Sequence, residues 1–137
     1  MAELGLEVVG VDIDAHKIEQ LSAGKSPIYE LDRPEIQTSA LASGRRRFMT
    51  DIAEAAGTRV HFIGVGTPQK PRSHAVDLSY VDTAVQSLLQ YLTTGNHVVG
   101  KSTVPIGTAV GLAGVIAASG SGASLAWNQI SYAKASL

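Results

Sequence analysis

The residues of this chain that could do chemistry are polar side chains that follow strand-like apolar runs. Asp12 comes at the end of the first run, Thr67 follows the second and Thr103 follows the third. Ligands of open parallel sheets bind beyond the carboxyl ends of the strands, which makes these positions informative. A carboxylate there accepts hydrogen bonds from the ribose hydroxyls of a nucleotide, and Lys17 could reach a phosphate as a point charge. The sequence therefore predicts a nucleotide site.

Each of these residues also has a plainer explanation. Taken alone, Asp12 is a turn aspartate and Lys17 is a lysine on a solvated helix face. Ser102 or Thr103 precedes a predicted helix, whose free N–H groups and positive dipole end favour anions or polarised oxygens. A serine or threonine at that place can equally be an ordinary N-cap. Spacing alone leaves these alternatives open.

Strand-like apolar runs alternate along the sequence with segments whose apolar residues recur every three or four positions, which predicts strands that alternate with helices. The predicted strands are residues 6–13, 59–65, 96–101 and 123–127, and the predicted helices are residues 15–21, 35–41, 78–92 and 105–118. Asp14 and Asp77 stand where the N-caps of two of these helices are expected. This alternation predicts an α/β fold in which helices cover both faces of a parallel sheet.

Composition and charge exclude several classes of function. The chain has 137 residues, with 11 Lys and Arg against 12 Asp and Glu, and its net charge of -1 disfavours nucleic acid or an anionic membrane as partner. The absence of cysteine excludes disulfides, thiolate metal sites and a cysteine nucleophile. It also fits a reducing compartment, and the N-terminus does not resemble a signal peptide, so we expect a cytoplasmic protein.

Neither a membrane helix nor a metal site is expected. Residues 102–133 are uncharged and include Gly107 and Gly111 in a GxxxG spacing, which raises the question of a membrane span. Pro105 and a glycine- and serine-rich segment leave an apolar run of about 15 residues, shorter than the ~20 needed to cross a bilayer. The histidines are scattered without the spacing of metal ligands and stand at His16, His61, His74 and His97.

Five segments together resemble the N-terminal domain of the UDP-glucose and GDP-mannose dehydrogenases. In order they are VVGVDID (8–14), GKSPIYE (24–30), GVGTP (64–68), KSTVPIG (101–107) and AWN (126–128). The SPIYE and KSTVPIG parts are specific, whereas any dinucleotide-binding fold could supply the VDID strand. The resemblance covers roughly residues 2–128 and implies a Rossmann-like fold.

The resemblance also implies an activity and a set of site residues. Members of that family oxidise a nucleotide sugar, such as UDP-glucose to UDP-glucuronate, by two successive hydride transfers to NAD through a thiol-bound intermediate. By the same resemblance, Asp12 is a ribose ligand, Lys17 a pyrophosphate contact and Thr67 a cofactor contact. Thr103 would orient the catalytic water and touch NAD, which makes it the candidate catalytic residue. The intact enzymes of this family form homo-oligomers.

The beginning of a complete dinucleotide-binding domain is not found in this sequence. Such a domain places its glycine fingerprint about 20 residues before the ribose acid, whereas only 11 residues precede Asp12. We therefore expect an incomplete doubly wound parallel sheet that lacks its first strand and glycine loop. Residues 1–128 would be a partial NAD-binding domain, inactive as an isolated chain.

Residues 129–137 form an aberrant tail, which we interpret as a frameshift product. After Asn128 the family continues Pro-Glu-Phe-Leu-Arg-Glu-Gly, with a glutamate implicated in catalysis, whereas this chain reads QISYAKASL. Permitted codons for residues 128–137, read from the third base of the Asn128 codon, spell Pro-Asp-Phe-Leu-Arg-Glu-Gly-Phe-Ala. A deletion of one base explains the change, and a gene whose codons cannot encode that string contradicts the hypothesis.

Three other functions remain open from the sequence. The chain could be a non-catalytic nucleotide-binding relic or an interaction module that contacts a full-length relative. It could also derive from an enzyme for GDP-mannose or UDP-N-acetylmannosamine, because the sugar-reading residues lie mostly outside the segments compared. A small α/β methyltransferase also ends a strand in a ribose-holding acid, but the SPIYE and KSTVPIG segments argue against it.

Overall fold

The computed structural model of the protein describes residues 4–25 and 42–127. The chain divides into two compact units, Met1–Ala56 and Gly57–Leu137, and each unit is described here by itself. The SPIYE segment, the helix predicted at residues 35–41 and the tail at residues 129–137 lie outside the described residues. The strands and helices that carry the candidate site residues lie inside them.

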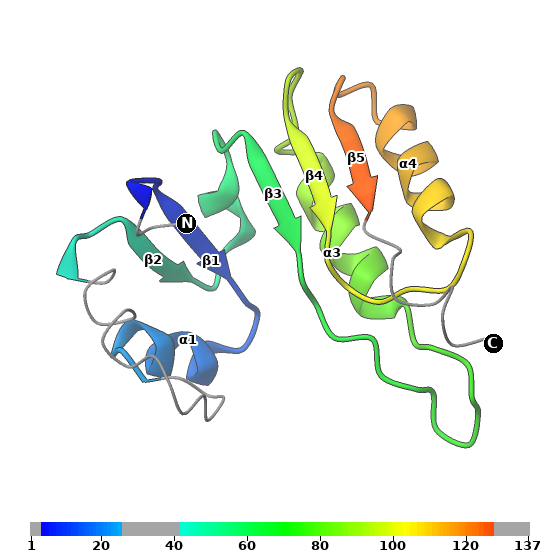
Figure 1. Ribbon diagram of the computed structural model, residues 1–137, viewed down its shortest axis with the longest axis horizontal. Coiled ribbons are helices and arrows are strands. Elements are labelled where there is room, and N and C mark those ends of the chain that lie inside the picture. The colour runs from blue at the N-terminus through cyan, green and yellow to red at the C-terminus, as the bar shows by residue number, and fades with distance from the viewer. Residues whose placement is uncertain (1–3, 26–41, 128–137) are drawn as a thin grey trace. The chain divides into compact units, whose positions relative to one another are not determined.

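The first unit contains a pair of parallel strands and the helix that follows the first strand (Figure 1). Its elements are β1 (Val8–Val11), α1 (Ala15–Ser22), β2 (Arg46–Met49) and the short 3-10 helix η2 (Ile52–Ala55). The register pairs Val8 with Arg46 and Val11 with Met49. Asp14 caps α1 as predicted, since its carboxylate accepts the backbone N–H of Lys17 at 3.1 Å.

The second unit contains a three-stranded parallel sheet in the order β3-β4-β5 (Figure 1). Its elements are β3 (Val60–Ile63), α3 (Ser79–Leu89), β4 (His97–Gly100), α4 (Thr108–Ala118) and β5 (Ser124–Trp127). All strands point the same way and each crossover carries a helix, as the predicted alternation requires. The carboxyl ends of the three strands therefore lie at one edge of this sheet.

Helices cover one face of the three-stranded sheet. The two crossovers step in the same direction, and right-handed crossovers then place α3 and α4 on the same side of the sheet. On the covered face His61, Ile63 and Val98 are 6%, 7% and 0% exposed, whereas Val60 and Phe62 on the opposite face are 46% and 50% exposed. Within the described residues of this unit, both helices therefore lie on one face of the sheet.

The five described strands form two separate sheets. Within the described residues, β1 pairs with β2 alone, and β3 pairs with β4 alone. The prediction of an α/β fold built on parallel strands is confirmed in each unit.

The hydrophobic core of the second unit lies between the two helices and the sheet. The helical periodicity that predicted residues 78–92 is confirmed, because Val81, Val85 and Leu88 of α3 are 0%, 1% and 2% exposed. Leu112 and Ile116 of α4 are also buried. Asp77 was expected to be the N-cap of α3, but the N-cap is Leu78, which makes no side-chain capping bond, and the Asp77 carboxylate accepts the N–H of Ser79 at 3.0 Å from one residue further upstream. In residues 4–25 and 42–127 no helix is both long and apolar enough to span a bilayer.

The start of α4 differs from the prediction. We expected Pro105 to open this helix, but α4 begins at Thr108. Its N-cap is Gly107, which has a φ of 91° and makes no side-chain capping bond. Glycine adopts this left-handed conformation without the steric cost that other residues pay, so the chain turns into the helix there. Ser102 and Thr103 are consequently too far upstream to be N-caps.

His61 is a buried histidine on the covered face of β3. Its ring Nδ1 lies 3.1 Å from Oγ1 of Thr58. Burial lowers the pKa of His61, because the charged ring is poorly solvated there, and the Asn96 side chain and the Thr58 backbone offset only part of that effect. The folded unit therefore favours the neutral ring.

The stability of the second unit is expected to fall as the pH drops below about 6.5, the ordinary histidine value. In that range the unfolded chain binds a proton that folded His61 resists, so acid favours unfolding until the lowered folded pKa is passed. Denaturant titrations between about pH 5 and 8 should give a shallower pH dependence of the unfolding free energy for His61→Gln. His97→Gln, at an exposed position of β4, is the control, and equal slopes for wild type and His61→Gln contradict the prediction.

Candidate functional site

Asp12 lies directly after β1, and both of its carboxylate oxygens are engaged. Oδ1 accepts the backbone N–H of Asp14 at 2.9 Å, and Oδ2 accepts Nζ of Lys17 at 2.8 Å. The side chains of Asp12 and Lys17 are 32% and 42% exposed. Each carboxylate oxygen has a second lone pair, so the two contacts leave acceptor capacity that faces solvent.

The surroundings of Asp12 keep its carboxylate charged. Partial burial raises the pKa of Asp12, but the hydrogen bonds from Lys17 and the Asp14 N–H and the positive charge of Lys17 outweigh it, and the net pKa is lowered. The pKa of Lys17 is raised by its hydrogen bond to Asp12 and by the charge of that carboxylate. A charged, partly exposed carboxylate can accept strong hydrogen bonds from the hydroxyls of a ribose.

Lys17 lies on the first turn of α1 and pairs with the predicted ribose ligand. The resemblance implied a pyrophosphate contact for Lys17, and the structure places its ammonium group on Asp12. An ammonium group has three donors, so this ion pair leaves two of them. Asp12 and Lys17 thus form one charged pair in the first unit.

Thr67 and Thr103 lie in the second unit, in the segments that follow β3 and β4. Thr67 is half-buried and Thr103 is exposed. Within residues 4–25 and 42–127 neither hydroxyl makes a hydrogen bond. Both are therefore available to a ligand at this edge of the three-stranded sheet. Asp12 and Lys17 thus belong to the first unit, and Thr67 and Thr103 belong to the second.

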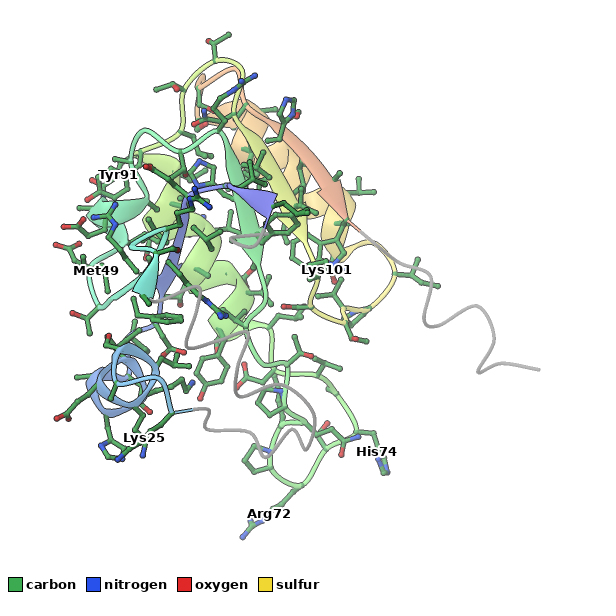
Figure 2. All side chains as sticks on the ribbon, turned by 60° about the vertical axis from the view of Figure 1, so that its left-hand side comes forward. Lys25, Met49, Arg72, His74, Tyr91 and Lys101 are labelled. Atoms are coloured by element: carbon green, nitrogen blue, oxygen red, sulfur yellow. The ribbon has the colours of Figure 1, made fainter. Side chains whose placement is uncertain are left out.

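Ser102 connects the segments that follow the three strands of the second unit. Its side chain is 7% exposed, and its hydroxyl donates to the backbone carbonyl of Val65 at 2.7 Å. The carbonyl of Ser102 accepts Nε1 of Trp127 at 2.9 Å. In Figure 2 the label of Lys101 marks this end of β4. From the sequence, Ser102 is interpreted as an N-cap or as part of an anion-binding helix start, and its bond to the Val65 carbonyl is not predicted.

No metal centre is found among the residues that the structure describes. No group of three or more His, Asp or Glu side chains in this part of the chain is placed to hold an ion. The four candidate residues, Asp12, Lys17, Thr67 and Thr103, offer one carboxylate, one ammonium group and two hydroxyls. These groups suit hydrogen bonding to a nucleotide.

Comparison with known proteins identifies the family. The sequence model of the UDP-glucose/GDP-mannose dehydrogenase family, NAD binding domain, matches residues 1–133. The chain is 43% identical over 108 residues to the UDP-glucose 6-dehydrogenase of Rhizobium meliloti (strain 1021). The aligned stretch covers 78% of this chain and 25% of that protein. It is 39% identical over 108 residues to the GDP-mannose 6-dehydrogenase of Pseudomonas syringae pv. tomato. That alignment covers 76% of this chain and 24% of that protein.

Solved structures give the same result for the fold. The structure of a UDP-glucose dehydrogenase from Pyrobaculum islandicum superposes with a TM-score of 0.78 at 39% sequence identity, covering 92% of this chain and 30% of that one. The chain thus spans about a quarter of the length of the curated relatives that it matches. The chain belongs to the UDP-glucose/GDP-mannose dehydrogenase family, and its residues 1–133 match the NAD binding domain of that family.

Proposed function

We propose that this chain is a part of an NAD-dependent nucleotide-sugar dehydrogenase and supplies cofactor-binding residues to it. The observation that carries the proposal is Asp12, a charged and partly exposed carboxylate directly after β1, in a chain that matches the NAD binding domain of this family. NAD accepts a hydride when it is bound. The residues of this chain fit such a cofactor, because they offer acceptors and donors that are free within the described residues.

Each candidate residue has a proposed role toward the cofactor. Asp12 accepts hydrogen bonds from the adenosine ribose hydroxyls, and Lys17 holds that carboxylate while its remaining donors serve a phosphate. Thr67 donates to the cofactor from the segment after β3. Thr103 contacts the cofactor and orients the water that takes part in catalysis. Both threonine hydroxyls lack a hydrogen-bond partner within the described residues, which supports these roles.

We propose UDP-glucose as the substrate of the intact enzyme. The relative with 43% identity is named a UDP-glucose 6-dehydrogenase, whereas the GDP-mannose 6-dehydrogenase of Pseudomonas syringae pv. tomato is 39% identical. The chain alone should not turn this substrate over, because it has no cysteine to form the thiol-bound intermediate. The proposal therefore separates cofactor binding, which this chain supports, from catalysis, which needs residues that it does not contain.

Calorimetric titration of the purified chain with NAD tests the proposal. We expect saturable binding in the micromolar range, and weaker binding of NADP, because the ribose 2′-phosphate meets the charge of Asp12. Mixing the chain with NAD and UDP-glucose should give no NADH. The absence of binding heat with either dinucleotide contradicts the proposal and favours a non-catalytic interaction module. Equal affinity for both cofactors contradicts the role of Asp12.

A further inference from the structure

Ser102 occupies the point where the ends of β3 and β4 diverge. The last backbone bond between the two strands runs from the N–H of Lys101 to the carbonyl of Ile63, at 2.8 Å. One residue further on, the two segments are joined by a side chain, because the hydroxyl of Ser102 donates to the carbonyl of Val65 at 2.7 Å. The side chain of Ser102 is 7% exposed, so water competes little for this bond. The hydroxyl therefore extends the connection between the two strands beyond the sheet.

Trp127 connects the end of β5 to the same residue. Its Nε1 donates to the backbone carbonyl of Ser102 at 2.9 Å, and its indole ring lies against Gly100 of β4. Gly100 and Trp127 are register partners, and a side chain at Gly100 would overlap the ring. Ser102, the carbonyl of Val65 and Trp127 form what we call the strand-end brace. One buried serine thus links all three strand ends of the second unit.

The brace lies next to both threonines that the cofactor is proposed to contact. Thr103 follows Ser102 directly, and Thr67 stands two residues after Val65. Neither threonine hydroxyl makes a hydrogen bond of its own within the described residues. The spacing between their two segments is therefore set by the backbone and by the brace. The exposed Ser124, which bonds Nδ1 of His97 at 2.7 Å near the opposite end of the sheet, has no such neighbours.

We propose that Ser102 is a positioning residue that holds Thr67 and Thr103 at the spacing that NAD requires, with Trp127 as its second support. The inference rests on the proposed binding of NAD. If Ser102 only filled space, its hydroxyl would not need to donate to the carbonyl of Val65. Its own carbonyl would not need to accept the indole N–H of Trp127 either. Here both contacts converge on Ser102, and the bond to the Val65 carbonyl joins the segment of Thr103 to the segment of Thr67.

Ser102→Ala tests the brace in the absence of any nucleotide. This substitution removes the hydroxyl but keeps the carbonyl that Trp127 uses, so a change at Trp127 reports movement of the segment. Trp127 is the chain's single tryptophan, which makes its fluorescence unambiguous. We expect a shift in its emission and about tenfold faster exchange of the Lys101 amide, because its bond to the carbonyl of Ile63 lies next to the buried hydrogen bond that is lost. In Trp127→Phe, which lacks the indole donor, the same amide should also exchange faster.

The nucleotide readout distinguishes positioning from a general loss of stability. The proposal assigns both threonines to the nicotinamide end of NAD, because they lie in the second mononucleotide-binding half of the fold. NAD should therefore bind Ser102→Ala about tenfold more weakly than wild type, whereas ADP-ribose, which lacks the nicotinamide ring, should lose less than about twofold. A destabilised unit would weaken both ligands alike. Ser124→Ala is the matched control, since it removes a serine hydroxyl from the same sheet, and it should leave the exchange of the Lys101 amide and both affinities unchanged.

The two kinds of measurement separate the brace from the proposed function. Unchanged exchange and unchanged Trp127 emission in Ser102→Ala overturn the proposal, whatever the chain binds. An equal loss of NAD and ADP-ribose affinity also overturns it. A wild-type chain that binds no dinucleotide contradicts the proposed function, and the exchange and fluorescence data then still decide whether Ser102 holds the two segments together.

Discussion

Replacement of Asp12 by alanine is expected to weaken NAD binding by about 10- to 100-fold. A hydrogen bond to a charged group contributes about 1.5–3 kcal/mol, and each 1.4 kcal/mol corresponds to about tenfold in affinity. The carboxylate of Asp12 is charged at neutral pH, since Lys17 and the Asp14 N–H lower its pKa. Titration calorimetry of wild type and Asp12→Ala with NAD measures the difference directly.

The same variant is expected to discriminate less between NAD and NADP. Removal of Asp12 takes away the charge that repels a 2′-phosphate, and it leaves Lys17 without its partner at 2.8 Å. The free ammonium group then attracts that phosphate. Glu19→Gln, an exposed position on α1, controls for the change in net charge and should keep both affinities. If Asp12→Ala binds NAD as tightly as wild type, the carboxylate is not a ribose ligand.

The candidate residues could be placed from the sequence because strand ends are strongly marked. β-branched runs identified β1 and β3, and the polar residues after them fall at the predicted places in the structure. The capping role of Asp14 was also predictable, because an N-cap bond spans only three residues. Strand ends and N-caps depend on residues that are close together along the chain. They can therefore be predicted from the sequence.

The strand β2 was not predicted, although it pairs with β1 along its whole length. Its sequence contains Arg46 and Arg47, which hide the alternation that a strand usually shows. In the structure the guanidinium of Arg46 lies 5.2 Å from the centre of the Phe48 ring, and its aliphatic stem can share that half-buried face. What makes this segment a strand is its pairing with β1. That contact lies far away in the sequence.

Ser102 illustrates the same limit at the candidate site. Its position before a predicted helix favoured an N-cap, whereas its hydroxyl bonds the carbonyl of Val65, which is 37 residues away. The left-handed Gly107 moves the start of α4 downstream and leaves Ser102 free for this bond. A buried contact between two loops follows from the packing of β3 against β4. No pattern within either segment predicts it.

Gly100→Ala is expected to destabilise the second unit by about 1–3 kcal/mol, the usual effect of overpacking a core. A Cβ at Gly100 would overlap the indole ring of Trp127, its register partner on β5. The ring cannot move away without loss of the bond from its Nε1 to Ser102. Denaturant unfolding monitored by circular dichroism measures the loss, and the emission of Trp127 in the native state should shift because the ring is displaced.

Gly111→Ala is the matched control, because the same chemical change is expected to have the opposite sign. Gly111 lies inside α4, and a Cβ there would meet nothing within 4 Å. Alanine in a helix interior is more stable than glycine by about 0.5–1 kcal/mol, since glycine loses more backbone freedom on folding. A stabilised Gly111→Ala beside a destabilised Gly100→Ala assigns the loss to the contact with Trp127. If both variants gain stability, the indole does not occupy the space above Gly100, and the strand-end brace loses its second support.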